Sequence, residues 1–547
     1  MTAASILITR ATVVDGTGAD RYPADVRLAD GVIAEVGAPG TLKALPGEEC
    51  VDAEGLVLSP GFIDMHAHSD LYLLTHPEHA AKLSQGVTTE VLGQDGLSYA
   101  PVTDATLPVL REKIAGWNGN PEDFDFSWRS VGEYLDRLDA PDADGQRIAT
   151  NAVYLVPQGT VRAAVLGFGE RPADDDEIAA MRRIVAAAME EGAVGMSSGL
   201  TYTPGMYATT AELGALCAEV AAHGGFFSPH HRSYGKGALE AYREMIELSR
   251  ASGCALHLAH ATMNFEENRG RAPELLEMID AALADGVDIT LDTYPYLPGA
   301  TTLSAVLPSW SSAGSVDDTL ARLADPASRE RIRRALEVEG SDGCHGVTAD
   351  WSTLEISSVQ NPELTDCIGR TVADIAAAAD EDPFETFCSI LTRDRLATGI
   401  LQHVGHEENV RAIMQHRVHT GGSDGLLHGA KPHPRAWGTF PRYLGQYCRE
   451  LGLLSLEEMV HHLTGRPAAR LKLDRRGVIA EGHAADVVLF DPETVDAAAT
   501  FPDPKQPARG IESVYVNGAL AWHRQEATGA RAGRALRRTE KGTKAND

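Results

Sequence analysis

The hydrophobic and polar positions of the 547-residue chain follow two patterns, one at its ends and another in its middle. Near the start, short runs of β-forming residues such as 5–14 alternate with turn sequences rich in Asp and Gly. The same pattern of short β-forming runs and turn sequences occurs near the end, in 485–490 and 511–522. Two separated β segments of this kind predict one small β-sandwich-like domain built from both termini, residues 1–57 together with 476–530.

The middle of the chain, 58–475, alternates helix-like and strand-like patterns. In 175–191, apolar residues recur at intervals of three and four, which predicts an amphipathic helix, and the short apolar run 193–196 follows it. The same order returns in 273–283 and 288–292. Repeated strand and helix units are typical of parallel βα folds. At this length they favour an α/β fold with a closed (β/α)8 barrel of the TIM type over an open sheet.

Two segments interrupt these patterns. Residues 299–348 are rich in serine and charged residues, which predicts an insertion in the late barrel. The last segment, 531–547, holds a run of basic residues: Arg531, Arg534, Arg537, Arg538, Lys541 and Lys544. A charge run at a terminus predicts a disordered, solvated tail, and we assign it no function.

Composition restricts the classes of function. The 48 basic and 78 acidic residues give a net charge of −30, which repels phosphate backbones and anionic lipids, so neither a nucleic acid nor a membrane is expected as a partner. No apolar run is long enough to span a bilayer. The seven cysteines form no Cys-x-x-Cys pair, and residues 1–10 lack the pattern of a secretory signal. These features predict reduced thiols in a cytoplasmic protein, and they are compatible with a homo-oligomer.

Histidine and acidic residues recur where predicted strands end. His66 and His68 lie in the sequence GFIDMHAHSD, two residues apart, so in a strand both imidazoles point to the side of Asp64. Barrel enzymes keep their active sites at this carboxyl end of the strands. Other predicted strands end near His230, His260 and Asp424.

Each of these later residues alone has an ordinary structural explanation. An isolated histidine is usually a hydrogen-bonded core or surface residue, and Ser-Asp-Gly is a common turn. Together with the His-x-His pair, however, they supply four imidazoles and a carboxylate. That set of ligands is best suited to zinc.

An ordered series of motifs extends this pattern along the chain: SPGFIDMHAHSD, QGVTTEVLGQDGLSYAP, SSGLTYTPG, DTYPYLPG, GGSDGLLHGAKPHPRAWGTFPR and EGHAADVVLFDP. With these motifs the chain resembles the amidohydrolase superfamily, in particular its D-aminoacylase (N-acyl-D-amino-acid deacylase) branch, over nearly its whole length. The resemblance implies a metal-dependent (β/α)8 barrel with a small β domain and one or two zinc ions. It also implies His66 and His68 as one metal pair, His230 and His260 as the other, and Asp424 as the catalytic acid/base.

The chain departs from the family pattern at two places. The deacylases usually have a cysteine ligand where this chain has Asp95, and 193–200 holds no lysine that could bridge two metals. Asp95 continues the phase of the preceding strand, so we predict it to be the bridging ligand; the alternative is a turn-forming Asp. The family's lysine and serine for the substrate carboxylate are replaced by Thr262 and Ala300.

Three residues match positions that contact substrate in the family, namely Tyr202, Tyr294 and Arg435, and Arg435 can still hold a carboxylate by two hydrogen bonds. The sequence therefore predicts an enzyme that hydrolyses the amide C–N bond of a small molecule, converting an N-acyl-D-amino acid and water into a D-amino acid and a carboxylate.

Two alternatives stay open. A cyclic-amide hydrolase of the hydantoinase or dihydroorotase kind would use the same metals and needs fewer contacts to a substrate carboxylate. A non-catalytic barrel that has lost its metal would serve as a scaffold. The scaffold's expected mark is erosion of the ligand residues, whereas every ligand position here holds a residue able to bind metal.

Overall fold

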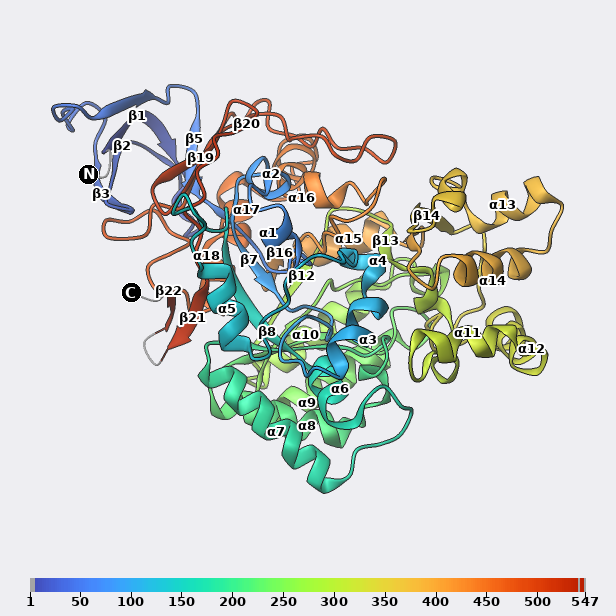
Figure 1. Ribbon diagram of the computed structural model, residues 1–547. Coiled ribbons are helices and arrows are strands. Elements are labelled where there is room, and N and C mark those ends of the chain that lie inside the picture. The colour runs from blue at the N-terminus through green and yellow to red at the C-terminus, as the bar shows by residue number, and fades with distance from the viewer. Residues whose placement is uncertain (1–4, 540–541, 546–547) are drawn as a thin grey trace.

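A computed structural model of the protein describes residues 5–539 and 542–545. It has three parts, a sheet built from both termini, a central barrel and an insertion that projects from the barrel on the side away from that sheet (Figure 1). Residues 1–4, which belong to the segment without a secretory pattern, lie outside the described residues.

Eight parallel strands form the central sheet, in the order β16-β12-β11-β10-β9-β8-β7-β6. Their bounds are β6 Phe62–Asp64, β7 Val87–Leu92, β8 Asn151–Pro157, β9 Gly195–Gly199, β10 Phe226–His230, β11 Ala255–Leu258, β12 Ile289–Thr293 and β16 His419–Gly421. The two outer strands meet, because Met65 N donates to Gly421 O at 3.0 Å and Ala67 forms a parallel bridge with Gly425. The sheet is thus closed, and the prediction of a (β/α)8 TIM-type barrel is confirmed.

Helices follow the strands and cover the barrel: α1 Tyr72–Thr75, α2 Ala80–Leu83, α3 Thr106–Lys113, α4 Ala115–Asn118, α5 Val131–Asp139, α6 Gln158–Leu166, α7 Asp175–Glu190, α8 Thr210–Ala222, α9 Ala238–Ser252, α10 Ala272–Ala284, α15 Glu407–Met414, α16 Arg435–Arg442, α17 Leu456–Leu463 and α18 Gly465–Arg470. In α7 the Asp174 side chain accepts from Glu177 N at the amino end, and Met181, Val185 and Met189 form the buried face. No helix among the described residues has both the length and the apolar character needed to cross a bilayer.

Strands from both ends of the chain form one nine-stranded sheet, in the order β20-β19-β18-β17-β5-β1-β2-β3 with β4 beside β1. Their bounds are β1 Ile6–Val13, β2 Tyr22–Ala29, β3 Val32–Gly37, β4 Glu49–Asp52, β5 Val57–Pro60, β17 Val487–Phe490, β18 Ile511–Val516, β19 Ala519–His523 and β20 Glu526–Ala527. The two ends meet where β5 pairs antiparallel with β17. Because β5 continues to Pro60, the sheet extends past the predicted boundary at residue 57.

The insertion is longer than predicted. It contains a three-stranded antiparallel sheet, β13-β15-β14, and four helices. Their bounds are β13 Gly299–Thr302, α11 Val316–Ala324, α12 Pro326–Arg334, β14 Leu354–Ser358, α13 Val372–Ala379, α14 Pro383–Arg393 and β15 Gly399–Gln402. Since β13 pairs with β15, the insertion runs to residue 402 instead of 348. The serine-rich, charged composition marks its first half only, and the second half has helix and strand patterns like those of the barrel.

The prediction of a disordered tail is wrong for the described part of 531–547. The strands β21 Leu536–Thr539 and β22 Gly542–Ala545 form a hairpin, and Ala535 bridges to Ala152 of β8. Three arginines pair with acidic residues in and after α5: Arg531 with Asp142, Arg534 with Asp139 and Arg537 with Asp136. Composition alone does not show that an acidic surface of the same chain neutralises these charges. Residues 540, 541, 546 and 547 of the tail lie outside the described residues.

Candidate metal centre

The six predicted metal ligands all lie at the carboxyl ends of barrel strands. His230 is the last residue of β10, and the others follow their strands within four residues: His66 and His68 after β6, Asp95 after β7, His260 after β11 and Asp424 after β16. All six are buried. Because the sheet is closed, these strand ends surround one mouth of the barrel.

The ligand atoms form two overlapping groups, within each of which all atoms lie within 4.8 Å of one another: His66, His68, Asp95 and Asp424 in one, and Asp95, His230 and His260 in the other. Asp95 belongs to both. Its Oδ1 lies 3.5 Å from His66 Nε2 and 3.4 Å from His260 Nε2. Its Oδ2 lies 3.6 Å from His68 Nε2 and 3.5 Å from His230 Nδ1. One carboxylate therefore lies beside four imidazoles, which is the position that a bridging ligand needs.

The chemistry of this cluster fits a divalent metal ion. Both ring nitrogens of His66 and Oδ1 of Asp95 are buried without a hydrogen-bond partner. Buried polar atoms are nearly always paired, so several unpaired ones that face each other require an explanation such as an ion. Four imidazoles and two carboxylates are ligands that zinc accepts.

The backbone at the centre is held in an uncommon conformation. Asp95, His260 and Asp424 have φ angles of +54°, +30° and +48°, in or near the left-handed region that costs a non-glycine residue about 1–3 kcal/mol. The phase of β7 had indicated that Asp95 extends that strand. Asp95 instead lies in a turn, and this turn directs its carboxylate toward the imidazoles. The neighbouring loops support this backbone, since Asp424 N donates to His66 O at 2.8 Å.

Opposite charges at the centre keep both carboxyl groups ionised. Burial raises the pKa of Asp95, but the charges of His260 and His66 outweigh burial and leave the pKa well below its usual value. Burial likewise raises the pKa of Asp424, yet the Arg435 guanidinium, whose Nη2 lies 2.9 Å from Oδ2, leaves this pKa lowered as well. Asp424 is therefore a carboxylate, able to accept a proton, at neutral pH.

The sequence analysis missed a carboxylate behind the centre. Asp292, in β12, is fully buried, and its Oδ2 lies 3.0 Å from His257 Nε2 and 3.6 Å from His66 Nδ1. Its Oδ1 accepts from His260 N at 3.0 Å. One side chain thus positions parts of two predicted ligands. An acidic residue near the carboxyl end of a predicted barrel strand was the signal that could have identified it.

Two hydroxyl groups that sequence reasoning also missed orient the second histidine pair. Tyr234 Oη lies 3.0 Å from His260 Nδ1, and Thr201 Oγ1 lies 2.7 Å from His230 Nε2. Both contacts use the ring nitrogen that does not face Asp95, so they fix each ring with its other nitrogen toward Asp95. Those two nitrogens, His230 Nδ1 and His260 Nε2, lie 3.0 Å from each other, and a metal ion would be held between them and Asp95.

A small cavity of about 70 Å³ opens beside the ligand cluster, and its wall includes Tyr202, Tyr294, Thr262 and Ala300. The insertion also supplies part of this wall, including His345. The cavity therefore joins the residues predicted to meet substrate with the metal cluster.

Arg435, the third residue predicted to contact substrate, does not line this cavity. It is fully buried, its Nη2 pairs with Asp424, and its guanidinium lies 4.5 Å from the centre of the Tyr294 ring. Its Nε and Nη1 have no hydrogen-bond partner. Arg435 thus lies behind Tyr294, and its Nε and Nη1 could still donate hydrogen bonds.

The chain is similar to known deacylases over almost its whole length. The model of the amidohydrolase family matches residues 49–521. D-aminoacylase from Alcaligenes xylosoxydans xylosoxydans is 36% identical over 534 residues, which cover 98% of each chain. N-acyl-D-glutamate deacylase from the same organism is 36% identical over 528 residues, covering 96% of this chain and 95% of the relative.

A solved structure shows the same architecture. It is the N-acyl-D-glutamate deacylase of Bordetella bronchiseptica in complex with zinc and a phosphonate inhibitor that mimics the tetrahedral intermediate of the reaction. It is 33% identical, with a TM-score of 0.81, and the match covers 98% of this chain and 100% of that one. The protein described here therefore belongs to the amidohydrolase family, in its D-aminoacylase branch.

Proposed function

We propose that the protein hydrolyses the amide C–N bond of an N-acyl-D-amino acid, releasing the D-amino acid and a carboxylic acid, with one or two zinc ions at the mouth of the barrel. The observation that carries the proposal is the position of Asp95 among four imidazoles, next to an ionised Asp424. The similarity to D-aminoacylase and N-acyl-D-glutamate deacylase supports the choice of substrate class.

The two overlapping groups indicate how the metal would be held. His66, His68 and Asp424 would hold one ion, His230 and His260 a second, and Asp95 would serve both. Zinc bound there supplies a Lewis acid for water and for an amide carbonyl. The hydroxyl groups of Tyr234 and Thr201 keep the second pair of rings in place for it.

Asp424 is the residue that moves the proton in this proposal. Its Oδ1 lies 3.2 Å from His68 Nε2, and Arg435 holds its Oδ2. As a carboxylate it accepts a proton from the attacking water, and it then donates that proton to the leaving nitrogen. Without this second transfer the nitrogen would have to leave as a strongly basic anion.

Tyr202 and Tyr294 define the sides of the substrate cavity, and Thr262 and Ala300 leave its wall without the family's lysine and serine. We assign the substrate's carboxylate to the side where Tyr294 covers Arg435, because that guanidinium has two nitrogens, Nε and Nη1, without a hydrogen-bond partner. Thr262 is also the observation that favours the second candidate, a cyclic-amide hydrolase, since a ring substrate needs fewer carboxylate contacts.

A hydrolysis panel tests the proposal. N-acetyl-D-leucine, N-acetyl-L-leucine, a hydantoin and dihydrouracil are offered to the purified protein, and bound metal is quantified. We expect the D substrate to be hydrolysed at least about tenfold faster than the L substrate, no ring opening, and one or two zinc ions per chain. Ring opening without hydrolysis of either N-acetyl substrate would show the cyclic-amide hydrolase instead, and a protein without metal or activity would be a scaffold.

Asp95→Asn should weaken zinc binding about 100-fold. The substitution keeps the shape of the side chain but removes a negative charge and one of the oxygen ligands from both groups at once, whereas loss of an outer contact alone costs about 10–100-fold. Competition with a fluorescent zinc chelator measures the affinity. The circular dichroism of both metal-free proteins serves as the folding control, and unchanged zinc affinity in a folded variant would contradict the bridging role.

We also propose that the protein acts in the cytoplasm. All seven cysteines are free thiols. Two of them, Cys217 and Cys254, are buried and interact with each other without forming a disulfide. Such thiols are typical of a reducing compartment.

A further inference from the structure

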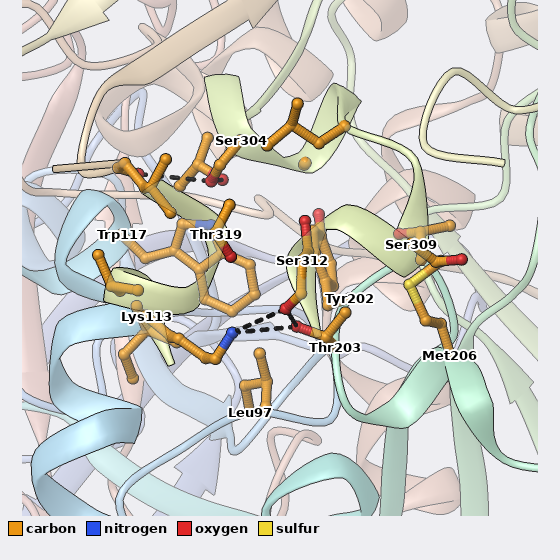
Figure 2. Close-up of a pocket in the computed structure, with 17 residues that line it drawn as sticks. Leu97, Lys113, Trp117, Tyr202, Thr203, Met206, Ser304, Ser309, Ser312 and Thr319 are labelled. Carbon is orange, nitrogen blue, oxygen red and sulfur yellow. Dashed lines mark hydrogen bonds between the residues drawn. The ribbon is translucent and has the colours of Figure 1, made fainter. Parts of the chain in front are cut away.

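A second cavity lies beside the metal centre, between the barrel and the insertion (Figure 2). Its wall is mostly apolar, with Leu97, Ile114 and Trp117 from the barrel side and Leu307, Val316 and Leu396 from the insertion. Its volume is about 70 Å³, several times the minimum that one water molecule needs. The cavity therefore fits a short, narrow chain.

Two aromatic rings separate this cavity from the predicted ligands. Tyr202 lines both cavities, and its ring centre lies 4.9 Å from that of His230. The ring centre of Trp117 lies 4.9 Å from that of Tyr202 and 5.5 Å from that of His68. The two cavities thus adjoin at Thr201, Tyr202 and Ala305, which line both of them.

A single ammonium group faces the apolar wall. Lys113, at the end of α3, donates from Nζ to Thr203 Oγ1 and to Ser312 O, both at 3.3 Å (Figure 2). Within the described part of the chain it forms no ion pair, in contrast to the buried Lys82, which meets both Asp64 and Glu90. The Phe168 ring lies 5.5 Å from Nζ, and the third N–H donor has no hydrogen-bond acceptor among the described residues, so it can serve a ligand.

The surroundings make this cation costly to keep without a counterion. Burial and, to a lesser extent, the charge of the nearby Arg322 together lower the pKa of Lys113 to about 8, against the opposing charges of Asp318 and Glu112. A desolvated cation gains most from a charged acceptor, because burial without a partner is unfavourable. Asp318 and Glu112 lie near enough to oppose the lowering of the pKa, but neither forms an ion pair with Nζ among the described residues, so the ammonium group can still bind an anion supplied from outside.

We propose that the second cavity is the subsite for the acyl group and that Lys113 binds a carboxylate at the end of a short acyl chain. The preferred substrates would then be D-amino acids acylated by a four-carbon dicarboxylic acid, as in an N-succinyl-D-amino acid. Beyond its reacting carbonyl carbon, a succinyl group adds two methylenes for the apolar wall and a carboxylate for the ammonium group of Lys113. This inference rests on the proposed function and names the acyl group that the same site prefers.

The test compares N-succinyl-D-leucine with N-butanoyl-D-leucine, which has the same number of acyl carbons but no terminal charge. We expect the wild type to show a kcat/KM at least about tenfold higher for the succinyl substrate. Lys113→Met should lower that value about 10- to 100-fold while changing the value for the butanoyl substrate less than about threefold. Lys113→Arg, which keeps the charge, should retain part of the preference.

Lys431→Met is the matched control. Lys431 also contacts the insertion, through Glu355 at 2.8 Å, but lines neither cavity. We expect it to leave the ratio of the two substrates unchanged. If Lys113 only fastens the insertion, Lys113→Met will slow both substrates equally, which would overturn the subsite.

The ratio of kcat/KM for the succinyl and butanoyl substrates in the wild type tests the acyl subsite even if Lys113→Met does not fold. Hydrolysis of the butanoyl substrate at least as fast as the succinyl one would overturn the acyl subsite and leave the proposed function standing. Failure to hydrolyse any N-acyl-D-amino acid would instead overturn the proposed function, and the subsite with it.

Discussion

Asp424→Asn should lower kcat about 10³- to 10⁴-fold at saturating zinc, with little change in KM. The amide has nearly the same shape as the carboxylate, but it cannot accept a proton from water or donate one to the leaving nitrogen. Removal of this one charge therefore affects the chemical step more than substrate binding. Steady-state kinetics on N-acetyl-D-leucine and zinc quantification of the same samples measure both parts of the expectation.

Glu355→Gln provides a matched control for that experiment. Glu355 is also a carboxylate paired with cations, with Lys431 Nζ at 2.8 Å and His403 Nε2 at 2.9 Å, but it lies in β14 and lines neither cavity. Its substitution should leave kcat within about twofold, as expected for an ion pair remote from the chemistry. Near-normal turnover by Asp424→Asn with full zinc occupancy would show that another group transfers the proton.

Lys82→Met should destabilise the protein by about 3–5 kcal/mol, which is the usual cost of removing one partner from a buried ion pair. Lys82, in α2, is fully buried; its Nζ meets Asp64 Oδ2, lies 3.6 Å from Glu90 Oε2 and donates to Ser423 Oγ at 2.8 Å. The substitution would leave two carboxylates in the interior with their cation gone. Urea unfolding followed by circular dichroism measures the loss.

The double variant Lys82→Met with Asp64→Asn tests the cause of that loss. Removal of the Asp64 charge leaves Glu90 alone, and Glu90 keeps a contact with His79 Nε2 at 2.6 Å. The double variant should therefore regain part of the lost stability, since the uncompensated charge is smaller. A single variant within about 1 kcal/mol of the wild type would mean that the ion pair contributes little beyond what Met provides by packing.

The fold was predictable as far as it depends on repeated local patterns. A helix with one apolar face and a strand with a short apolar run both leave a local pattern in the sequence. The patterns in 175–191 and 193–196 therefore predicted α7 and β9. The extent of the insertion depends on the pairing of β13 with β15, which are nearly 100 residues apart. The order in 531–539 depends likewise on acidic partners in and after α5. Contacts between distant segments leave no local periodic signal.

The candidate site divides in the same way. Parallel strands in a barrel all end at one mouth, so residues at their carboxyl ends lie close together regardless of the conformation of the loops that follow. The phase of a strand is a less reliable guide to where side chains point beyond its end. In this chain β6 ends at Asp64, and the backbone bends at Met65 and His66. Asp64 therefore contacts Lys82 and Ser423, whereas the phase of the strand had placed it beside His66 and His68. The ion pair between Asp424 and Arg435 has no sequence signature at all.

The sheet that unites the two termini also determines the order in which the molecule can be completed during translation. Its β5 emerges from the ribosome among the first residues, but the neighbour of β5 on one side, β17, begins at Val487. All eight barrel strands lie between these segments in the sequence, so they are synthesised before that neighbour exists. Domains tend to fold in the order of their synthesis. Here β5 gains its antiparallel partner only after the whole barrel has been synthesised.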